Sequence, residues 1–289
     1  MQYEGIVIRP PSEARSLILQ ATFGCSHNKC TFCPTYKGAR FRIKDEARLF
    51  AEIDEMAALR SWRRVFLADG DALIIPQARL VRILEKLRES LPGCERVGIY
   101  GNAKSIEKKS VEELRELREL GLGIIYFGLE SGDDATLEFI CKGRTGEQMI
   151  AAGRHVKESG IALSITVLLG ISPGRPREHA IATGRVLSAI DPEFAGALTV
   201  MVVPGTPLWE LQEKKEWQLP DEFVGLEELA LMLEHTHMSD GLFMSNHASN
   251  YVPLKVRMPE DKDDAVRRLR DILESRDRSA LKPEQFRAL

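Results

Sequence analysis

The chain has 289 residues, enough for one large domain or two ordinary ones with a substantial core. Its 40 Lys and Arg residues stand against 43 Asp and Glu residues, and a net charge of −3 provides no overall positive field for nucleic acid or an anionic membrane. No apolar run approaches about 18 residues and residues 1–11 lack a signal-peptide pattern, so we expect a cytoplasmic protein with neither a membrane nor a nucleic-acid partner.

Short β-branched apolar runs alternate with longer segments of helical period, a pattern typical of βα units around a parallel sheet. The predicted strands are 16–21, 65–68, 96–100, 123–128, 162–170 and 197–203. The predicted helices between them are 45–59, 77–91, 111–120, 146–159 and 177–190. In the third helix an apolar residue recurs every three positions from Val111 to Leu120, which predicts one stripe packed on the sheet.

Six consecutive βα units with right-handed crossovers predict an α/β fold, a partial (β/α)6 TIM-like barrel. Sites in such folds lie at the carboxyl ends of the strands, where this sequence gathers cysteines, glycines and charged residues. After Val203 the pattern changes to shorter helical pieces, a polar stretch with histidines and an amphipathic segment. We therefore expect a barrel core over residues 1–208 and a C-terminal helical extension, 209–289, that covers or flanks it.

Three of the five cysteines lie within nine residues after the first predicted strand: Cys25, Cys30 and Cys33, spaced C-x4-C-x2-C. The other two are isolated, so we expect no disulfide framework. Three thiolates from one loop can bind three corners of a cubane iron–sulfur cluster and leave the fourth iron open for chemistry. The alternative is a Cys3His zinc site that adds His27, although residues only two to five apart leave a tetrahedral site little loop to fold around.

The cysteine loop, with Phe32 directly before its last cysteine, resembles the signature of the radical S-adenosylmethionine (radical SAM) superfamily. The usual spacing there is C-x3-C-x2-C, so this loop has one extra residue between its first two cysteines. The resemblance extends from about residue 16 to residue 208. Its motif style is similar to that of the branch that contains anaerobic coproporphyrinogen dehydrogenase-like proteins.

Polar residues follow the second and third predicted strands, and the resemblance connects those after the second strand with the cofactor. The sequence Asp69-Gly70-Asp71 stands where the family carries a Gly-Gly-Glu-type motif that contacts the methionyl amino group, here with Asp in place of Glu. Asn102, after the third strand, is a candidate for contact with substrate or cofactor. The alternatives are that the two aspartates are helix N-caps and that Asn102 is an ordinary turn residue.

The later motifs extend this set of cofactor-binding candidates. Glu130, in the sequence Phe-Gly-Leu-Glu-Ser-Gly after the fourth strand, is expected to contact the cofactor. Lys142 or Arg144 would bind its carboxylate, and the sequence leaves open which of them does. Leu169, at the end of the fifth strand, would pack against the adenine. Phe32 would shield the cluster or touch the adenine, or else pack the core of the loop.

The resemblance implies an enzyme that uses a [4Fe–4S] cluster and S-adenosylmethionine. The reduced cluster would cleave S-adenosylmethionine to a 5′-deoxyadenosyl radical, which would act on a small-molecule substrate under anaerobic conditions. The electron would come from a low-potential donor such as flavodoxin or ferredoxin. The alternative is a non-catalytic iron–sulfur or zinc-binding protein, acting as an electron carrier, a binding module or a scaffold.

Two groups of residues have open roles in the sequence. Cys141 is either a hydrogen-atom donor or methyl carrier, or a buried small hydrophobe, whereas Cys94 is expected to be structural. His235, His237 and His247 either contact the substrate or are satisfied or exposed histidines.

Overall fold

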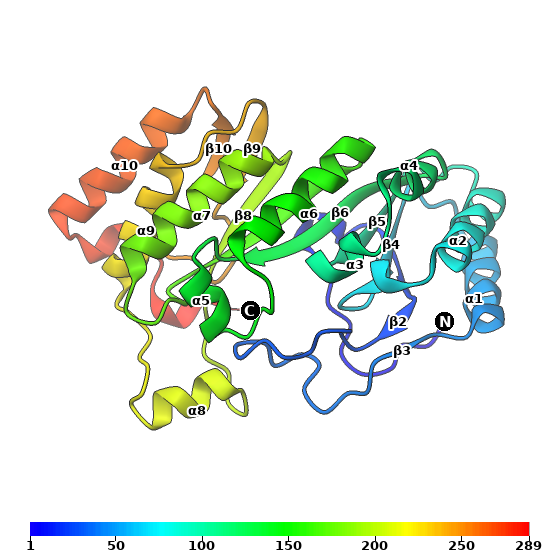
Figure 1. Cartoon of the computed structure of the whole chain (residues 1–289), viewed down its shortest axis with the longest axis horizontal. Coiled ribbons are helices and arrows are strands. Elements are labelled where there is room, and N and C mark those ends of the chain that lie inside the picture. Colours follow the sequence, from blue (N-terminus) through cyan, green and yellow to red (C-terminus); the bar gives the residue numbers. More distant parts are fainter. Residues whose placement is uncertain (289) are drawn as a thin grey trace. The chain divides into compact units, whose positions relative to one another are not determined.

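The structure is a computed structural model that describes residues 1–288. The strands form an eight-stranded sheet in the order β1-β4-β5-β6-β7-β8-β9-β10 and a small sheet of β2 and β3 (Figure 1). The predicted α/β class with a parallel sheet and a helical C-terminal part is confirmed. None of the helices within residues 1–288 is both long and apolar enough to cross a membrane.

The chain divides into two compact units that interleave along the sequence. Unit 1 contains 1–28, 35–127 and 152–163, and unit 2 contains 29–34, 128–151 and the residues from 164 onward. The predicted boundary between residues 208 and 209 stays a prediction.

Unit 1 contains four parallel neighbours in the main sheet and the helices that follow them. Its strands are β1 (Leu17–Gln20), β2 (Thr22–Phe23), β3 (Arg42–Ile43), β4 (Arg64–Ala68), β5 (Arg96–Gly101) and most of β6 (Leu122–Glu130). Its helices are α1 (Glu46–Leu59), α2 (Gln77–Ser90), α3 (Ala103–Glu107) and α4 (Val111–Glu119). Helix α4 begins at Ser110 with a capping box to Glu113 and buries Leu114 and Leu117, as its three-residue spacing predicts.

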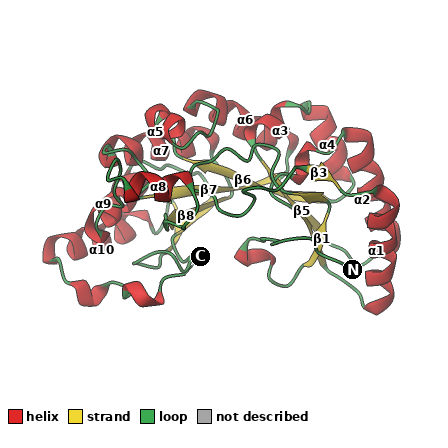
Figure 2. Ribbon diagram, turned by 90° about the horizontal axis from the view of Figure 1, so that it is seen from below, coloured by secondary structure: helices red, strands yellow, loops and turns green. Residues whose placement is uncertain are grey.

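One face of the unit 1 sheet is rich in aromatic side chains. Paired positions of parallel strands point to the same side, so Ile18 of β1 and Phe66 of β4 share this face. The Phe66 ring lies 4.9 Å from that of Tyr100 on β5 and 5.7 Å from that of Tyr126 on β6. We call this the inner face, and helices α1 and α2 cover the other face (Figure 2).

Unit 2 contains most of β7 (Ala162–Leu169), then β8 (Phe194–Thr199), β9 (Gly241–Met244) and β10 (Lys255–Met258), with α6 (Gly146–Ser159) and β7 divided between the units. Its helices are α5 (Asp134–Phe139), α7 (Pro176–Ile190), α8 (Pro207–Glu213), α9 (Glu222–Glu234) and α10 (Lys262–Ser275). Helix α9 packs against both α7 and α10, which explains why apolar residues surround almost its whole circumference.

The six predicted strands and five predicted helices all form, but the position of one strand is wrong. The sixth strand, expected at 197–203, is β8 at Phe194–Thr199, because its pairing with β7 starts at Phe194 and includes the weak strand formers Ala195 and Gly196. The C-terminal extension also adds strands β9 and β10, whose stabilisation by the neighbouring sheet has no strong local signal.

Candidate active site

The first part of the site, in unit 1, is built around Asp69 directly after β4. The side chain of Asp69 accepts hydrogen bonds from the Tyr36 hydroxyl and, at 3.3 Å, from Gln20 Nε2. Its own backbone N–H donates to Thr22 Oγ1 at 3.1 Å. Burial raises the pKa of Asp69 and outweighs the hydrogen bonds that lower it, and burial together with Asp69 raises the pKa of the Tyr36 phenol. Tyr36 therefore stays a neutral donor that orients this carboxyl group.

Gly70 brings the first cysteine against this motif. A Cβ atom at Gly70 would lie 2.5 Å from the Tyr36 ring and 3.0 Å from Cys25 Cβ, so a larger residue does not fit without displacing them. The half-buried Cys25 thus packs directly on the residue between Asp69 and Asp71. Cys25 and Gly70 are far apart in the sequence, so the local sequence pattern could not predict this contact.

Asp71 is fully buried and connects the cysteine loop to the end of β5. Its carboxyl group accepts from Ser26 Oγ and from the backbone N–H of Asn102 at 3.4 Å, and burial raises its pKa. Asp71 stands at the N-cap of a short 3-10 helix, 72–74, but its side chain makes no cap hydrogen bond. Asn102 does cap a helix, since it forms a capping box with Ser105 at the start of α3, and its Nδ2 lies 3.4 Å from Ser26 Oγ.

The rest of the cysteine loop, residues 29–34, belongs to unit 2. Thr31 anchors it, because its N–H donates to Ile140 O at 3.1 Å and its carbonyl accepts from Leu208 N at 3.0 Å. The Thr31 side-chain oxygen is buried and has no hydrogen-bond partner among residues 1–288. Cys30 and Cys33 flank it and are both half-buried. Phe32 is also half-buried.

An ion pair lies at the end of β6, within unit 2. Glu130 adopts a left-handed backbone conformation with φ of 65°, and its Oε1 lies 3.0 Å from Lys142 Nζ. A Cβ atom at Gly128 would collide with the Glu130 carboxyl group, so the absence of a side chain there leaves room for the pair. Arg144 donates to the carbonyl of Gly143 at 2.8 Å. Which of the two basic residues binds a cofactor carboxylate stays a prediction.

A buried histidine joins the ends of β6 and β7. In His179 of α7, Nδ1 lies 2.8 Å from Ser131 Oγ, and Nε2 lies 2.8 Å from Leu168 O. A carbonyl can only accept, so Nε2 carries the proton and Nδ1 accepts from the Ser131 hydroxyl. Burial lowers the pKa of His179 to about 4 and keeps the ring neutral. This residue was missed by the sequence analysis, because a single histidine on an amphipathic helix carries no distinguishing signal.

A further buried carboxyl group, from α9, contacts the loop after β7. Leu169 is 2% exposed, and the N–H of the next residue, Gly170, donates to Glu228 Oε2 of α9 at 2.5 Å. Burial raises the pKa of Glu228 to about 8. Glu228 Oε1 is buried and has no hydrogen-bond partner within the described chain.

The other candidates from the sequence are the two isolated cysteines and the C-terminal histidines. Cys141 is exposed, so the interpretation as a buried small hydrophobe is wrong, and Cys94 is half-buried. His247 Nδ1 lies 2.9 Å from Ser249 Oγ. Within residues 1–288, no three His, Cys, Asp or Glu side chains are arranged to hold a single metal ion.

The radical SAM superfamily model matches residues 19–184, more than half of the chain, and the chain therefore belongs to this superfamily. It is an enzyme class whose cofactors are a [4Fe–4S] cluster and S-adenosylmethionine, and a similar solved structure, a radical S-adenosylmethionine methyltransferase from Kitasatospora setae, contains cobalamin and the cluster. The family, the enzyme class and the cofactors expected from the cysteine loop are thus confirmed.

Individual relatives are distant and differ in activity. An uncharacterised protein of Methanocaldococcus jannaschii is 25% identical over 249 residues, covering 81% of this chain and 75% of that protein. An uncharacterised methyltransferase of Pyrococcus horikoshii is 27% identical over 196 residues, covering 67% of this chain but only 41% of its own length.

Two similar solved structures agree on the fold. Methylornithine synthase has a TM-score of 0.55 at 20% identity and covers 77% of this chain and 63% of its own. Coproporphyrinogen III oxidase of Escherichia coli has a TM-score of 0.56 at 16% identity, with coverages of 76% and 53%. The chain thus spans less than two thirds of each of these enzymes.

Proposed function

We propose that this enzyme reductively cleaves S-adenosylmethionine at a [4Fe–4S] cluster bound by Cys25, Cys30 and Cys33, and that the radical produced removes hydrogen from a small-molecule substrate. The observation that carries the proposal is the packing of Cys25 on Gly70, between two buried carboxyl groups. A cluster ligand and a site for a cationic amino group are thereby combined in one unit.

The chemistry of the donor set fits the cluster. Three thiols in one loop leave one iron open, whereas electron-carrier clusters are normally fully ligated. The buried, unpartnered Thr31 hydroxyl between Cys30 and Cys33 is a hydrogen-bond donor of the kind that cluster sulfides accept. When bound, the cluster and S-adenosylmethionine supply a 5′-deoxyadenosyl radical.

Asp69 is the acceptor that we propose for the amino group of S-adenosylmethionine. An ammonium group beside this carboxyl group favours its ionised form and opposes the rise in pKa caused by burial. Tyr36 and Gln20 hold the Asp69 oxygens in place by hydrogen bonds, so the carboxylate needs little reorganisation on binding. Asp71 positions the same loop through Ser26.

The ion pair at the end of β6 provides the complementary charge. The Lys142 ammonium group, held at 3.0 Å by Glu130, is the group that we propose for the cofactor carboxylate, while Glu130 accepts from cofactor hydroxyl groups. Both side chains are about nine-tenths buried, which strengthens their electrostatic interactions relative to water. Leu169, which is expected to pack against the adenine, is almost fully buried within the chain, so its side chain has little surface left for a direct contact.

The test is an anaerobic reconstitution followed by reduction and product analysis. The holoenzyme should contain about four irons per chain and convert S-adenosylmethionine to 5′-deoxyadenosine. Cys30→Ala should lose the cluster, whereas Cys94→Ala, a change at an isolated cysteine, should retain it. One zinc and no iron would support the zinc-binding alternative, and an intact cluster without 5′-deoxyadenosine under any reductant would refute the proposal.

Product analysis also separates radical formation from methyl transfer, the alternative suggested by the similarity to the uncharacterised methyltransferase of Pyrococcus horikoshii. Release of S-adenosylhomocysteine without 5′-deoxyadenosine would assign the chain to methyl transfer. Parallel reactions with reduced flavodoxin, reduced ferredoxin and a chemical reductant test the proposed low-potential electron donor.

A further inference from the structure

The segment before β1 forms one wall of a cavity in unit 1. It runs along β1 and is held there by a bond from the Tyr3 hydroxyl to Ile18 O at 2.9 Å, and by two bonds between the Glu4 backbone and the Gln20 side chain, at 2.8 and 2.9 Å. The cavity has a volume of about 260 Å³. Its lining residues are Tyr3, Gly5, Val7, Arg9 and Ile18.

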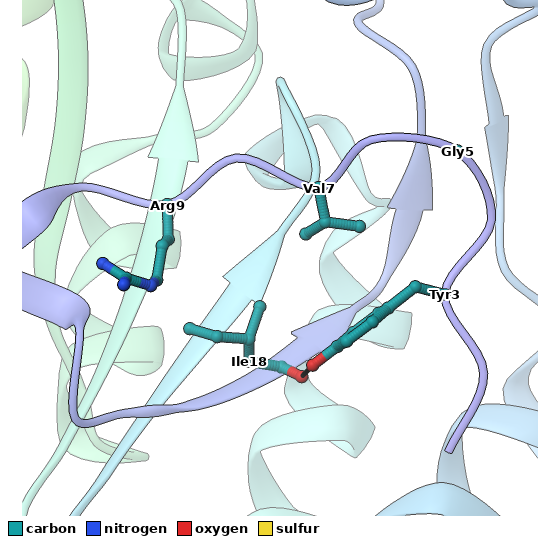
Figure 3. A pocket seen from close by; sticks show the side chains of 5 residues that line it. All are labelled: Tyr3, Gly5, Val7, Arg9 and Ile18. Carbon is teal, nitrogen blue, oxygen red and sulfur yellow. Dashed lines mark hydrogen bonds between the residues drawn. The ribbon is translucent and has the colours of Figure 1, made fainter. Parts of the chain in front are cut away.

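The residues of this segment that line the cavity alternate along the chain, from Tyr3 to Arg9, as the side chains of an extended segment do. Figure 3 shows the side chains of Tyr3, Val7 and Arg9 on the same side as Ile18. The intervening Ile6 and Ile8 are 70% and 42% exposed. The alternation therefore turns one apolar wall and one cation toward the inner face of the sheet.

Arg9 carries a charge that the protein does not neutralise. Within the described residues its side chain donates one hydrogen bond, from Nη1 to the carbonyl of Pro10 at 3.4 Å, and forms no salt bridge with a carboxylate. A guanidinium group presents several N–H donors in a plane that matches a carboxylate or a phosphate.

Tyr100 lies beside Phe66 on the inner face, with 4.9 Å between the two ring centroids. Burial raises the pKa of its phenol, which therefore stays neutral. Tyr100 is not among the residues that line the cavity, so the group of the lining that can pair with an anion is Arg9.

We propose that this cavity binds a small organic anion, with its carboxylate or phosphate on Arg9 and its apolar part against Val7 and Ile18, and that this anion is the substrate class of the enzyme. The assignment of the anion as substrate rests on the proposed function. Position supports it, because Ile18 lies two residues from Gln20 on the same face of β1, about 7 Å along the strand. Gln20 in turn donates to Asp69, the residue proposed to hold the cofactor.

The test measures binding rather than turnover. Equilibrium dialysis of the reconstituted holoenzyme with S-adenosylmethionine, without reductant, compares hexanoate, hexyl phosphate, hexanamide and hexylammonium. At least one of the two anions should bind about tenfold more tightly than both hexanamide and hexylammonium. The anion that binds identifies the head group as carboxylate or phosphate.

Three variants separate the cavity from general charge effects. Arg9→Gln should weaken binding of the preferred anion by about tenfold or more, whereas Tyr100→Phe, a change outside the cavity lining that keeps the ring packing, should leave it unchanged. Arg15→Gln, a change at another exposed arginine of the same segment, should leave binding unchanged. Equal binding of hexanamide, equal losses in Arg9→Gln and Arg15→Gln, or no binding of either anion at millimolar concentration would overturn the proposal.

The two proposals fail in different measurements. Absence of 5′-deoxyadenosine from the reduced wild-type holoenzyme counts against the radical reaction and leaves the dialysis result intact. Conversely, absence of anion binding counts against the cavity as a substrate site and leaves the cleavage of S-adenosylmethionine intact.

Discussion

The buried Glu228 predicts that the stability of this enzyme falls as the pH rises through neutrality. Burial raises the pKa of Glu228 from 4.5 to about 8, so the folded state binds more protons than the unfolded state between these values. The contribution of Glu228 to the free energy of unfolding is therefore most favourable below about pH 4.5, and it decreases as the pH rises to about 8. At 1.36 kcal/mol per pKa unit, the cost of folding caused by Glu228 grows by about 3 kcal/mol between about pH 5 and pH 8.

Glu228→Gln isolates this contribution. Glutamine retains an oxygen that can accept from Gly170 N but cannot ionise, so the variant should match the wild type near pH 5 and exceed its free energy of unfolding by about 3 kcal/mol near pH 8. Urea unfolding of both proteins over this range measures the difference.

The matched control is Glu227→Gln on the same helix. The Glu227 side chain is 39% exposed and pairs with Arg177 at the surface, so its loss should change stability by less than about 1 kcal/mol at every pH. A constant difference between wild type and Glu228→Gln from pH 5 to pH 8 would refute the argument that Glu228 is protonated in the folded protein.

Three further predictions concern stability and cluster retention. Glu52→Gln breaks a buried 2.6 Å ion pair with Lys44. It should reduce the free energy of unfolding by about 3–5 kcal/mol, because the Lys44 ammonium group stays buried without its counter-charge. Urea unfolding tests this, and a loss below about 1 kcal/mol would contradict it. His179→Phe removes two hydrogen bonds that connect the ends of β6 and β7. It should lower the free energy of unfolding by about 1–3 kcal/mol for each polar group left unsatisfied, and amide exchange at Ser131 should become faster. Unchanged exchange would show that the two loops do not depend on the histidine. Gly70→Ala should lower the iron content and the thermal midpoint, since the new methyl group overlaps the Tyr36 ring, and full iron content with an unchanged midpoint would count against the close packing.

The sequence alone predicted the main helices and strands of the α/β core and the superfamily. Helical and strand periods are local properties, so α1, α2, α4, α6 and α7 form where periodicity predicts them. Cys25, Cys30 and Cys33 likewise lie within one loop, and together with the motifs at the later strand ends they indicated the superfamily.

Only the tertiary structure decided which side chains meet across distant segments. The contacts of Tyr36 with Asp69, of His179 with Ser131, and of Glu228 with Gly170 join residues 33 to 58 positions apart. Strand register and helix packing create such pairs, and neither leaves a mark on the local sequence pattern. The sequence showed three thiols and several carboxylates but not their arrangement. The fold places Cys25 against Gly70, between Asp69 and Asp71, and burial raises the pKa of both carboxyl groups.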